Sequence, residues 1–186
     1  MQITSLESAT GVSIIPVTVH HAADLASLVR RNDEHLRAYL PAVAKLSTAE
    51  ATTSHLLAAE ERSAKGEIFE WHLFESGTLC GSVRIKDIDQ ADRKAKIGYF
   101  IDSQFAGRGI VTSAVSAVLA YCFGPLRLNR IELRCAAGNE RSQRVAERLG
   151  FVHEGLLRQE EYLNGVFIDQ HVYGLLSTDF QADGRL

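Results

Sequence analysis

A loop with two glycines is the part of the chain best suited to bind an anion. Its sequence is Gln-Phe-Ala-Gly-Arg-Gly at 104–109, after an apolar segment at 95–101 and before an apolar stretch at 109–123. If a helix begins at that stretch, it presents unpaired backbone N–H groups and the positive end of its dipole to the loop. Gly107 and Gly109 have no Cβ, so a diphosphate can approach the backbone closely.

The spacing of these glycines separates the loop from two common phosphate-binding motifs. It has neither the GxxxxGK[ST] pattern of a P-loop nor the GxGxxG pattern of a dinucleotide site. Taken alone, the loop is equally compatible with a tight turn that binds nothing. The strand expected before it and the long amphipathic helix expected after it favour the anion-binding interpretation.

Length and composition predict one domain over residues 1–186. Hydrophobic residues make up 46% of the chain and the formal net charge is −3. This balance indicates neither a nucleic-acid-binding surface nor a polybasic membrane patch. Residues 1–10 lack a basic stretch followed by an apolar run, so no signal peptide is expected. No apolar stretch approaches the roughly 20 residues that cross a membrane.

The three cysteines predict a reduced, cytoplasmic protein. Cys80, Cys122 and Cys135 are odd in number and none has CxxC spacing, which argues against a disulfide framework and against a zinc site. We therefore expect no bound metal. Cys122 lies on the apolar side of a predicted helix and is expected in the core.

Apolar periodicity predicts a mixed α/β domain. Strands are expected at 12–17, 69–75, 79–86, 95–101, 130–135, 151–161 and 166–175. Helices are expected at 20–31, 33–40, about 47–65, about 109–123 and 139–149. Ser47 and Glu50 form a capping-box pattern, Pro41 should end a helix, and Asn164-Gly165 favours a tight hairpin. Because hairpins and helical crossovers alternate, the sheet should be mixed.

A series of segments carries a more specific signal than the loop alone. They read KIGYFI at 96–101, QxxGxGI at 104–110, LNRIELRC at 128–135, NxxSxxVAERLGF at 139–151, EGxLR at 154–158, Asn-Gly at 164–165 and Asp169. In this order they resemble the acetyl-CoA-binding motifs of the GNAT superfamily. The later segments, with HLRxxLP at 35–41, are similar to its RimJ/RimL-type branch, the ribosomal-protein N-terminal acetyltransferases. The resemblance spans nearly the whole chain and is strongest at 95–175.

The resemblance implies a GNAT fold, an α/β domain with a mixed, mostly antiparallel twisted sheet flanked by helices. Two central parallel strands, 95–101 and 130–135, would splay apart around the pantetheine arm of acetyl-CoA. Asn139 and Ser142 would lie near its thiol end. The cofactor-binding residues that it implies are Tyr99, Phe100, Ile101, Gln104, Phe105, Ala106, Gly107, Arg108, Gly109, Ile110, Asn139 and Ser142.

The implied reaction is direct attack of a neutral primary amine on the thioester carbonyl. It requires close approach of the reactants, a base, stabilisation of the oxyanion and help for the departing thiolate. The resemblance assigns the base to Glu161. Glu160 is the alternative, since adjacent strand residues face opposite sides, and either can instead be a solvated surface carboxylate. A backbone N–H near Tyr99 and Phe100 is the expected oxyanion donor.

Two positions depart from the common GNAT pattern. Many relatives place a tyrosine acid where this chain has Ala146. In RimL-type enzymes a serine takes this part, and the matching residue is Ser142, whose hydroxyl can donate a hydrogen bond to the thiolate. The alternative is that Ser142 only caps or fills its helix. Lys96 stands where relatives often carry Glu, so no base is expected on that strand.

The acceptor implied by the branch is a protein N-terminus, with a ribosomal protein as the leading case. A small amine (a polyamine, an amino acid or an antibiotic) is the alternative, and a non-catalytic acyl-CoA-binding protein is a further one. Residues 19–65 and the 160–168 hairpin should wall the acceptor site. His20 and His21 are expected on the polar surface. The sequence leaves open a homodimer and a longer acyl donor.

Overall fold

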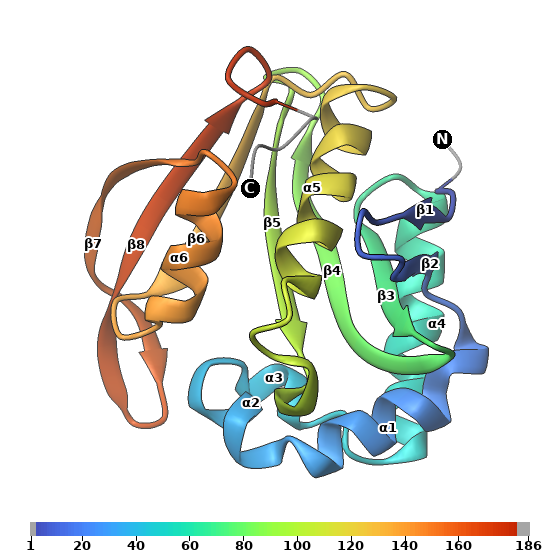
Figure 1. The fold of residues 1–186 in the computed structure, drawn as a ribbon. Coiled ribbons are helices and arrows are strands. Elements are labelled where there is room, and N and C mark those ends of the chain that lie inside the picture. Colours follow the sequence, from blue (N-terminus) through green and yellow to red (C-terminus); the bar gives the residue numbers. More distant parts are fainter. Residues whose placement is uncertain (1–2, 182–186) are drawn as a thin grey trace.

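Eight strands form one twisted sheet in the computed structural model, which describes residues 3–181 (Figure 1). The strands are β1 (Leu6–Glu7), β2 (Ser13–Pro16), β3 (Phe69–Glu75), β4 (Thr78–Asp89), β5 (Lys94–Ile101), β6 (Arg130–Ala136), β7 (Val152–Leu163) and β8 (Val166–Leu176). Their order across the sheet is β1-β2-β3-β4-β5-β6-β8-β7. All neighbours are antiparallel except β5 and β6, so the mixed, mostly antiparallel sheet predicted above is confirmed.

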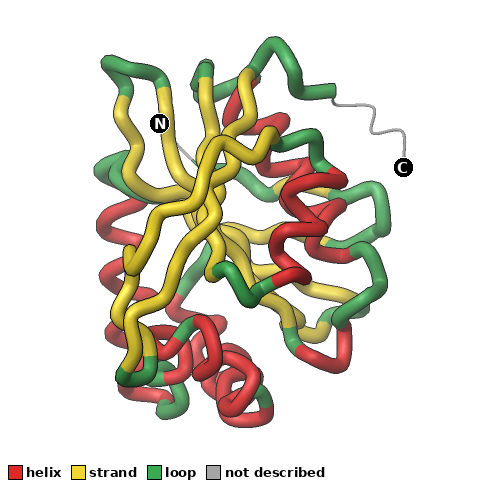
Figure 2. Tube along the Cα trace, turned by 90° about the vertical axis from the view of Figure 1, so that its left-hand side faces the viewer, coloured by secondary structure: helices red, strands yellow, loops and turns green. Residues whose placement is uncertain are grey.

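The helices cover both faces of this sheet (Figure 2). They are the short 3-10 helices η1 (Val19–His21) and η2 (Ser103–Phe105), and α1 (Ala22–Arg31), α2 (Asp33–Tyr39), α3 (Pro41–Ala44), α4 (Ala49–Ala64), α5 (Ile110–Phe123) and α6 (Glu140–Arg148). No helix within residues 3–181 is long and apolar enough to cross a membrane.

The parallel pair β5–β6 separates part of the way along its length. Strand pairing runs from Lys94 opposite Arg130 to Ile97 opposite Leu133 and stops there, although both strands continue. Figure 1 shows β6, β8 and β7 turning away from β5 toward the end where α2 and α3 lie. This is the splayed pair implied by the family resemblance. Beyond Ile97, the edge of β5 that faces β6 has no strand partner, so its peptide groups are open on that side.

Two hydrophobic cores follow from strand alternation. One lies between the sheet and α5, with Trp71, Ile97 and Val115 fully or nearly fully buried. The other lies on the opposite face, where Leu28 of α1 and Leu56 of α4 pack over β3 and β4. The β5–α5 connection is therefore held between two packed layers.

Local signals placed one helix start wrongly and missed one short helix. The helix predicted from about Ser47 begins at Ala49, because Thr48 is the residue whose side chain accepts the Ala51 N–H at 3.2 Å. Pro41 follows the end of α2 but also begins α3, since proline has no N–H to leave unpaired in a first helical turn. Strand β1 and the continuation of β4 to Asp89 were missed by the sequence patterns.

Candidate active site

The glycine loop has the backbone form that its sequence predicts for an anion site. Gly107 and Gly109 have φ angles of 77° and 76°, a left-handed conformation that disfavours any residue with a Cβ. A Cβ built on either would meet no heavy atom within 4 Å, so the space over both is open. Gly109 caps α5, whose first backbone hydrogen bond runs from Ser113 to Gly109. The N-terminus of α5, a helix of 14 residues, therefore points at this open space.

A buried aspartate fixes the start of this loop. Asp102 is fully buried and accepts hydrogen bonds from the Gln104 N–H at 3.0 Å and from Arg31 Nε at 2.5 Å. Asn32, also buried, accepts the Ser103 N–H at 2.9 Å. Burial raises the pKa of Asp102, but the bonds from Gln104, Arg31 and Asn32 outweigh it and leave that pKa lowered. The loop is thus tied to the end of α1.

Ser142 and Asn139 lie at the start of α6, beside the splayed strands. Asn139 caps the helix by accepting the Ser142 N–H at 3.2 Å. The Ser142 hydroxyl lies 2.8 Å from the Tyr99 hydroxyl of β5. The thiol of Cys135 lies beside Ser142, and burial raises its pKa to about 11, so it stays protonated at neutral pH. Ala146, where other relatives carry a tyrosine, is fully buried.

A β-bulge changes how the two glutamates of β7 are oriented. Pairing of β7 with β8 shifts between Leu157 and Glu161, and Gln159 has a φ of 53°. Glu160 accepts Arg134 Nη1 at 2.7 Å, and Glu161 accepts Gln170 Nε2 at 2.6 Å. The expectation that the two face opposite sides is wrong here, because the extra residues of the bulge rotate Glu160 toward the same neighbouring strands.

The glutamates and Ser142 lie on opposite faces of the sheet. Arg134 and Ala136 alternate with the buried Cys135 along β6, and Gln170 is the strand partner of Ala136. Strand alternation therefore puts the partners of both glutamates on the face away from Cys135 and α6. Ser142 thus lies beside the opening between β5 and β6 through its contact with Tyr99, whereas Glu161 lies on the other face, on the edge strand β7.

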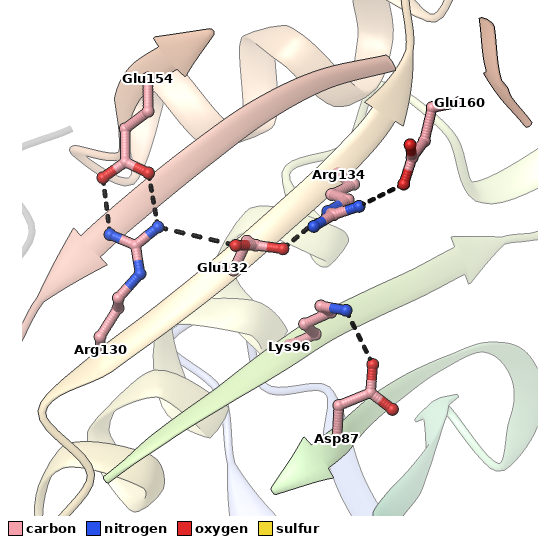
Figure 3. A network of polar contacts seen from close by, with 7 residues as sticks. All are labelled: Asp87, Lys96, Arg130, Glu132, Arg134, Glu154 and Glu160. Atoms are coloured by element: carbon pink, nitrogen blue, oxygen red, sulfur yellow. Dashed lines mark hydrogen bonds and ion pairs between the residues drawn. The ribbon is translucent and has the colours of Figure 1, made fainter. Parts of the chain in front are cut away.

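The ion pairs near the opening join strands on the same side of it, not across it (Figure 3). On one side Lys96 pairs with Asp87 of β4 at 3.0 Å. On the other, a chain of contacts joins β6 to β7. This chain consists of Glu154–Arg130, Arg130–Glu132, Glu132–Arg134 and Arg134–Glu160. Among the described residues no ion pair joins β5 to β6, and the opening stays free of such a crosslink.

A cavity of about 480 Å³ lies at the end of the sheet where β6 turns into α6, and neither Glu161 nor Ser142 is among its lining residues. Its lining residues are Ala38, Tyr39, Ala136, Ala137, Gly138, Leu163, Asn164, Val166, Phe167, Ile168 and Asp169. They come from α2, the β6–α6 turn and the β7–β8 hairpin. Tyr39 donates a hydrogen bond to the Gly138 carbonyl at 3.1 Å, and Asn164 donates one to the Arg37 carbonyl at 2.9 Å. Helix α2 therefore joins the two sides across this end.

Sequence patterns missed a buried polar cluster under α4. Glu70 pairs with Arg84, accepts the Ser82 hydroxyl at 3.1 Å and lies near His55. Burial raises the pKa of Glu70, but His55 and Arg84 outweigh this and lower it to about 2. The apolar pattern of the 69–75 strand did not predict a buried charged cluster. The only sequence signal for it is the pair of polar residues at positions 70 and 72 of that strand.

The sequence predicted the environment of only one of the two histidines at the start of the first helix. His20 is exposed as expected, but His21 is half-buried with its Nδ1 3.0 Å from Nδ1 of His72. Burial lowers the pKa of His72 to about 3, so its ring is neutral. His153 and His171 contact each other at 2.8 Å, and strand pairing sets His171 on the face of Cys135 rather than that of Glu161.

Known proteins are related to this chain in sequence and in structure. Residues 12–152 match the family model described as an acetyltransferase (GNAT) domain. The chain is 36% identical to Bacillus subtilis (strain 168) YdaF, named as a candidate ribosomal N-acetyltransferase, over 87% of this chain and 89% of that protein. It is 27% identical to the ribosomal-protein-serine acetyltransferase of Escherichia coli (strain K12), over 84% and 88%.

A solved structure agrees over almost the whole fold. RimL, a ribosomal L7/L12 alpha-N-protein acetyltransferase in complex with coenzyme A, superposes with a TM-score of 0.89 at 25% identity, covering 92% of this chain and 97% of that one. With the splayed parallel pair and the glycine loop at the start of α5, these matches show that the chain belongs to the GNAT family and is an acetyltransferase.

Proposed function

We propose that the chain transfers an acetyl group from acetyl-CoA to the α-amine of a protein N-terminus, with a ribosomal protein as the leading acceptor. The observation that carries the proposal is the contact of Ser142 with Tyr99 across the opening between β5 and β6, with Glu161 on the opposite face of the sheet, on strand β7. The glycine loop follows the unpaired end of β5, and the 480 Å³ cavity lies beside the β6–α6 turn and the β7–β8 hairpin. Ribosomal-protein acetyltransferases among the relatives support this choice of acceptor.

The residues present fit the donor. Within residues 3–181, the N–H groups of Gly107, Arg108 and Gly109 donate no backbone hydrogen bond, which leaves them free for a pyrophosphate. The open edge of β5 from Tyr99 to Ile101 offers peptide groups to the amides of pantetheine. When bound, acetyl-CoA supplies the thioester that the amine attacks.

Glu161 is the proposed base. An α-amine has a reference pKa near ~8, so roughly a tenth of it is neutral at pH 7, and the attacking amine must lose one further proton. Glu161 is half-buried and is held by the neutral amide of Gln170, which leaves its other oxygen available to accept that proton. Glu160 is already paired with the Arg134 guanidinium at 2.7 Å, so its carboxylate is occupied by that contact.

Ser142 is the proposed donor to the departing thiolate. Its hydroxyl is near the N-terminus of α6, where the helix dipole also favours a negative charge. Asn139 caps the same turn and fixes the position of that residue. A serine hydroxyl can stabilise the thiolate by a hydrogen bond without giving up its proton.

The cavity supports a peptide acceptor. Its lining is mostly small or apolar, and Val166 and Phe167 are 59% and 62% exposed at its hairpin side. Exposed apolar side chains next to a cavity of this size give room for a first residue and a surface for the residues that follow it. A protein N-terminus offers both an α-amine and such a following segment.

Mass spectrometry of peptides incubated with the enzyme and acetyl-CoA tests the function. We expect acetylation at the α-amine of ribosomal N-terminal peptides and none at the lysine side chains of the same peptides with a blocked N-terminus. Glu161→Gln should slow transfer roughly 100-fold, while Glu160→Gln stays within about three-fold. Acetylation of spermidine or amino acids without any peptide product would contradict the proposed acceptor.

A further inference from the structure

The Tyr99 side chain makes a contact that its proposed backbone role does not use. Its hydroxyl lies 2.8 Å from Ser142 Oγ and 3.4 Å from the Ser142 carbonyl oxygen. Tyr99 belongs to β5, and Ser142 belongs to the helix that follows β6. This hydrogen bond therefore spans the opening between the splayed strands, on the face opposite Glu161.

The direction of this hydrogen bond follows from the phenol. Burial raises the pKa of Tyr99, so the hydroxyl keeps its proton at neutral pH. A neutral phenol is a strong donor, and Ser142 Oγ is the nearer of the two oxygens within its reach. When Ser142 Oγ accepts this hydrogen bond, its own O–H hydrogen is free to turn toward another acceptor.

Ser142 needs a hydrogen-bonding partner because position 146 is alanine and supplies no hydroxyl of its own. A serine hydroxyl rotates freely about its Cβ–Oγ bond, whereas a tyrosine in that helix would have brought a fixed donor. Hydrogen bonds in series also polarise one another, so a Ser142 hydroxyl that accepts from Tyr99 donates more strongly itself. A second hydroxyl in contact with the serine supplies both orientation and polarisation.

We propose that Tyr99 is a positioning residue that directs the Ser142 hydroxyl at the sulfur of the leaving CoA. This inference rests on the proposed function, because it assigns the departing group. When the carbon–sulfur bond breaks, the electron pair goes to sulfur and the proton of the amine goes to Glu161. Ser142 and Tyr99 keep their protons, and the thiolate takes one from solvent on release.

Single-turnover acetyl transfer by Tyr99→Phe, Ser142→Ala and the double variant tests this role. Tyr99→Phe keeps the ring and should slow transfer roughly ten-fold, with acetyl-CoA affinity by calorimetry within two-fold of the wild type. The double variant should be no slower than Ser142→Ala alone, because Tyr99 acts through Ser142. An acetyl selenoester of CoA, with a better leaving group, should reduce the Tyr99→Phe defect. Thr178→Ala, which removes an exposed hydroxyl whose hydrogen-bond partner is the neighbouring Asp179, is the control and should match the wild type.

The outcomes separate this inference from the proposed function. If no peptide is acetylated, the proposed acceptor fails, and slow hydrolysis of acetyl-CoA, which releases the same thiolate, replaces the assay for Tyr99. Transfer by Tyr99→Phe at the wild-type rate would overturn the inference. So would multiplicative defects in the double variant, or a Tyr99→Phe defect beside a normal Ser142→Ala enzyme, since Tyr99 would then act without the serine.

Discussion

The two sides of the splayed pair are built in different ways. On the β1–β5 side, five of the seven residues of β3 are buried, and buried Glu70 and Asp102 are neutralised by arginines. On the β6–β8 side, β7 has one buried residue among twelve, and its ion pairs lie on the surface. The first side carries the glycine loop, and the second carries the hairpin that lines the cavity.

This difference fits the two substrates of the proposed function. In that proposal the donor is always the same molecule, so its loop gains from a frame that is fixed by burial and by paired charges. The proposed acceptor is a peptide chain, and an exposed hairpin can change its side chains to fit one at little cost in stability. Stability should therefore depend on the β1–β5 side, and acceptor choice on the β6–β8 side.

The largest expected loss of stability comes from replacing the buried Asp102. Asp102→Ala should lower the free energy of unfolding by about 4 kcal/mol, because it leaves Arg31 and the Gln104 N–H without their acceptor. Glu154→Ala removes a surface ion pair on the other side and should cost less than about 1 kcal/mol. Urea denaturation measures both. Equal losses would remove the contrast between the two sides.

The free energy of unfolding in acid should depend on the buried Glu70. Its pKa is about 2 in the folded protein, below the ordinary value of 4.5, so its contribution is complete above pH 4.5 and is lost as the pH falls toward 2. The contribution is on the order of 3 kcal/mol at 1.36 kcal/mol per pKa unit. Glu70→Gln should flatten the fall of unfolding free energy over this interval. An unchanged slope would mean that other carboxylates control it.

A paired glycine experiment separates strain from ligand binding. Gly109→Ala and Gly11→Ala both place a Cβ on a backbone with φ near 75°, at 76° and 74°, and each should cost about 1–2 kcal/mol. Only Gly109 lies in the loop, so only its variant should raise the KM for acetyl-CoA, by roughly ten-fold. A similar rise for Gly11→Ala would show that the effect comes from general destabilisation.

The smallest effect is expected on the hairpin. Phe167→Ser should change the free energy of unfolding by less than about 0.5 kcal/mol, since the side chain is 62% exposed. It should raise the KM for the peptide about five-fold and leave that for acetyl-CoA unchanged. Val152→Ser, 59% exposed on the same sheet but outside the cavity lining, is the control. A change in acetyl-CoA KM would contradict the division of roles.

Local patterns predicted most of the elements but not their long-range polar contacts. The helix at 110–123 and the strand at 69–75 follow from residue periodicity within a short window. Arg31 and Asp102 are 71 residues apart in the sequence, and His21 and His72 are 51 apart. The residues near each partner therefore give no local pattern that predicts the contact. Such pairs exist only once the fold has brought η1 against β3 and the end of α1 against the residue that follows β5.

The site was predicted to a similar depth. The loop and Ser142 were proposed from motifs and the family resemblance, and their roles stay predictions. The expected relation of Glu160 to Glu161 was wrong, because sequence patterns did not predict the β-bulge. Tyr99 was expected to contribute backbone groups, and its hydroxyl contact with Ser142 went unnoticed. Alternation along β5 did contain that signal, since Tyr99 shares a face with Ile97, which packs toward α5.

Hydrogen–deuterium exchange with and without CoA tests the division between the two sides most directly. CoA should slow exchange at the N–H groups of residues 107–112 and of the open edge of β5, because these groups donate to the ligand. Exchange in the 160–168 hairpin should change little until a peptide is added. Protection of the hairpin by CoA alone, with none at the glycine loop, would contradict the account.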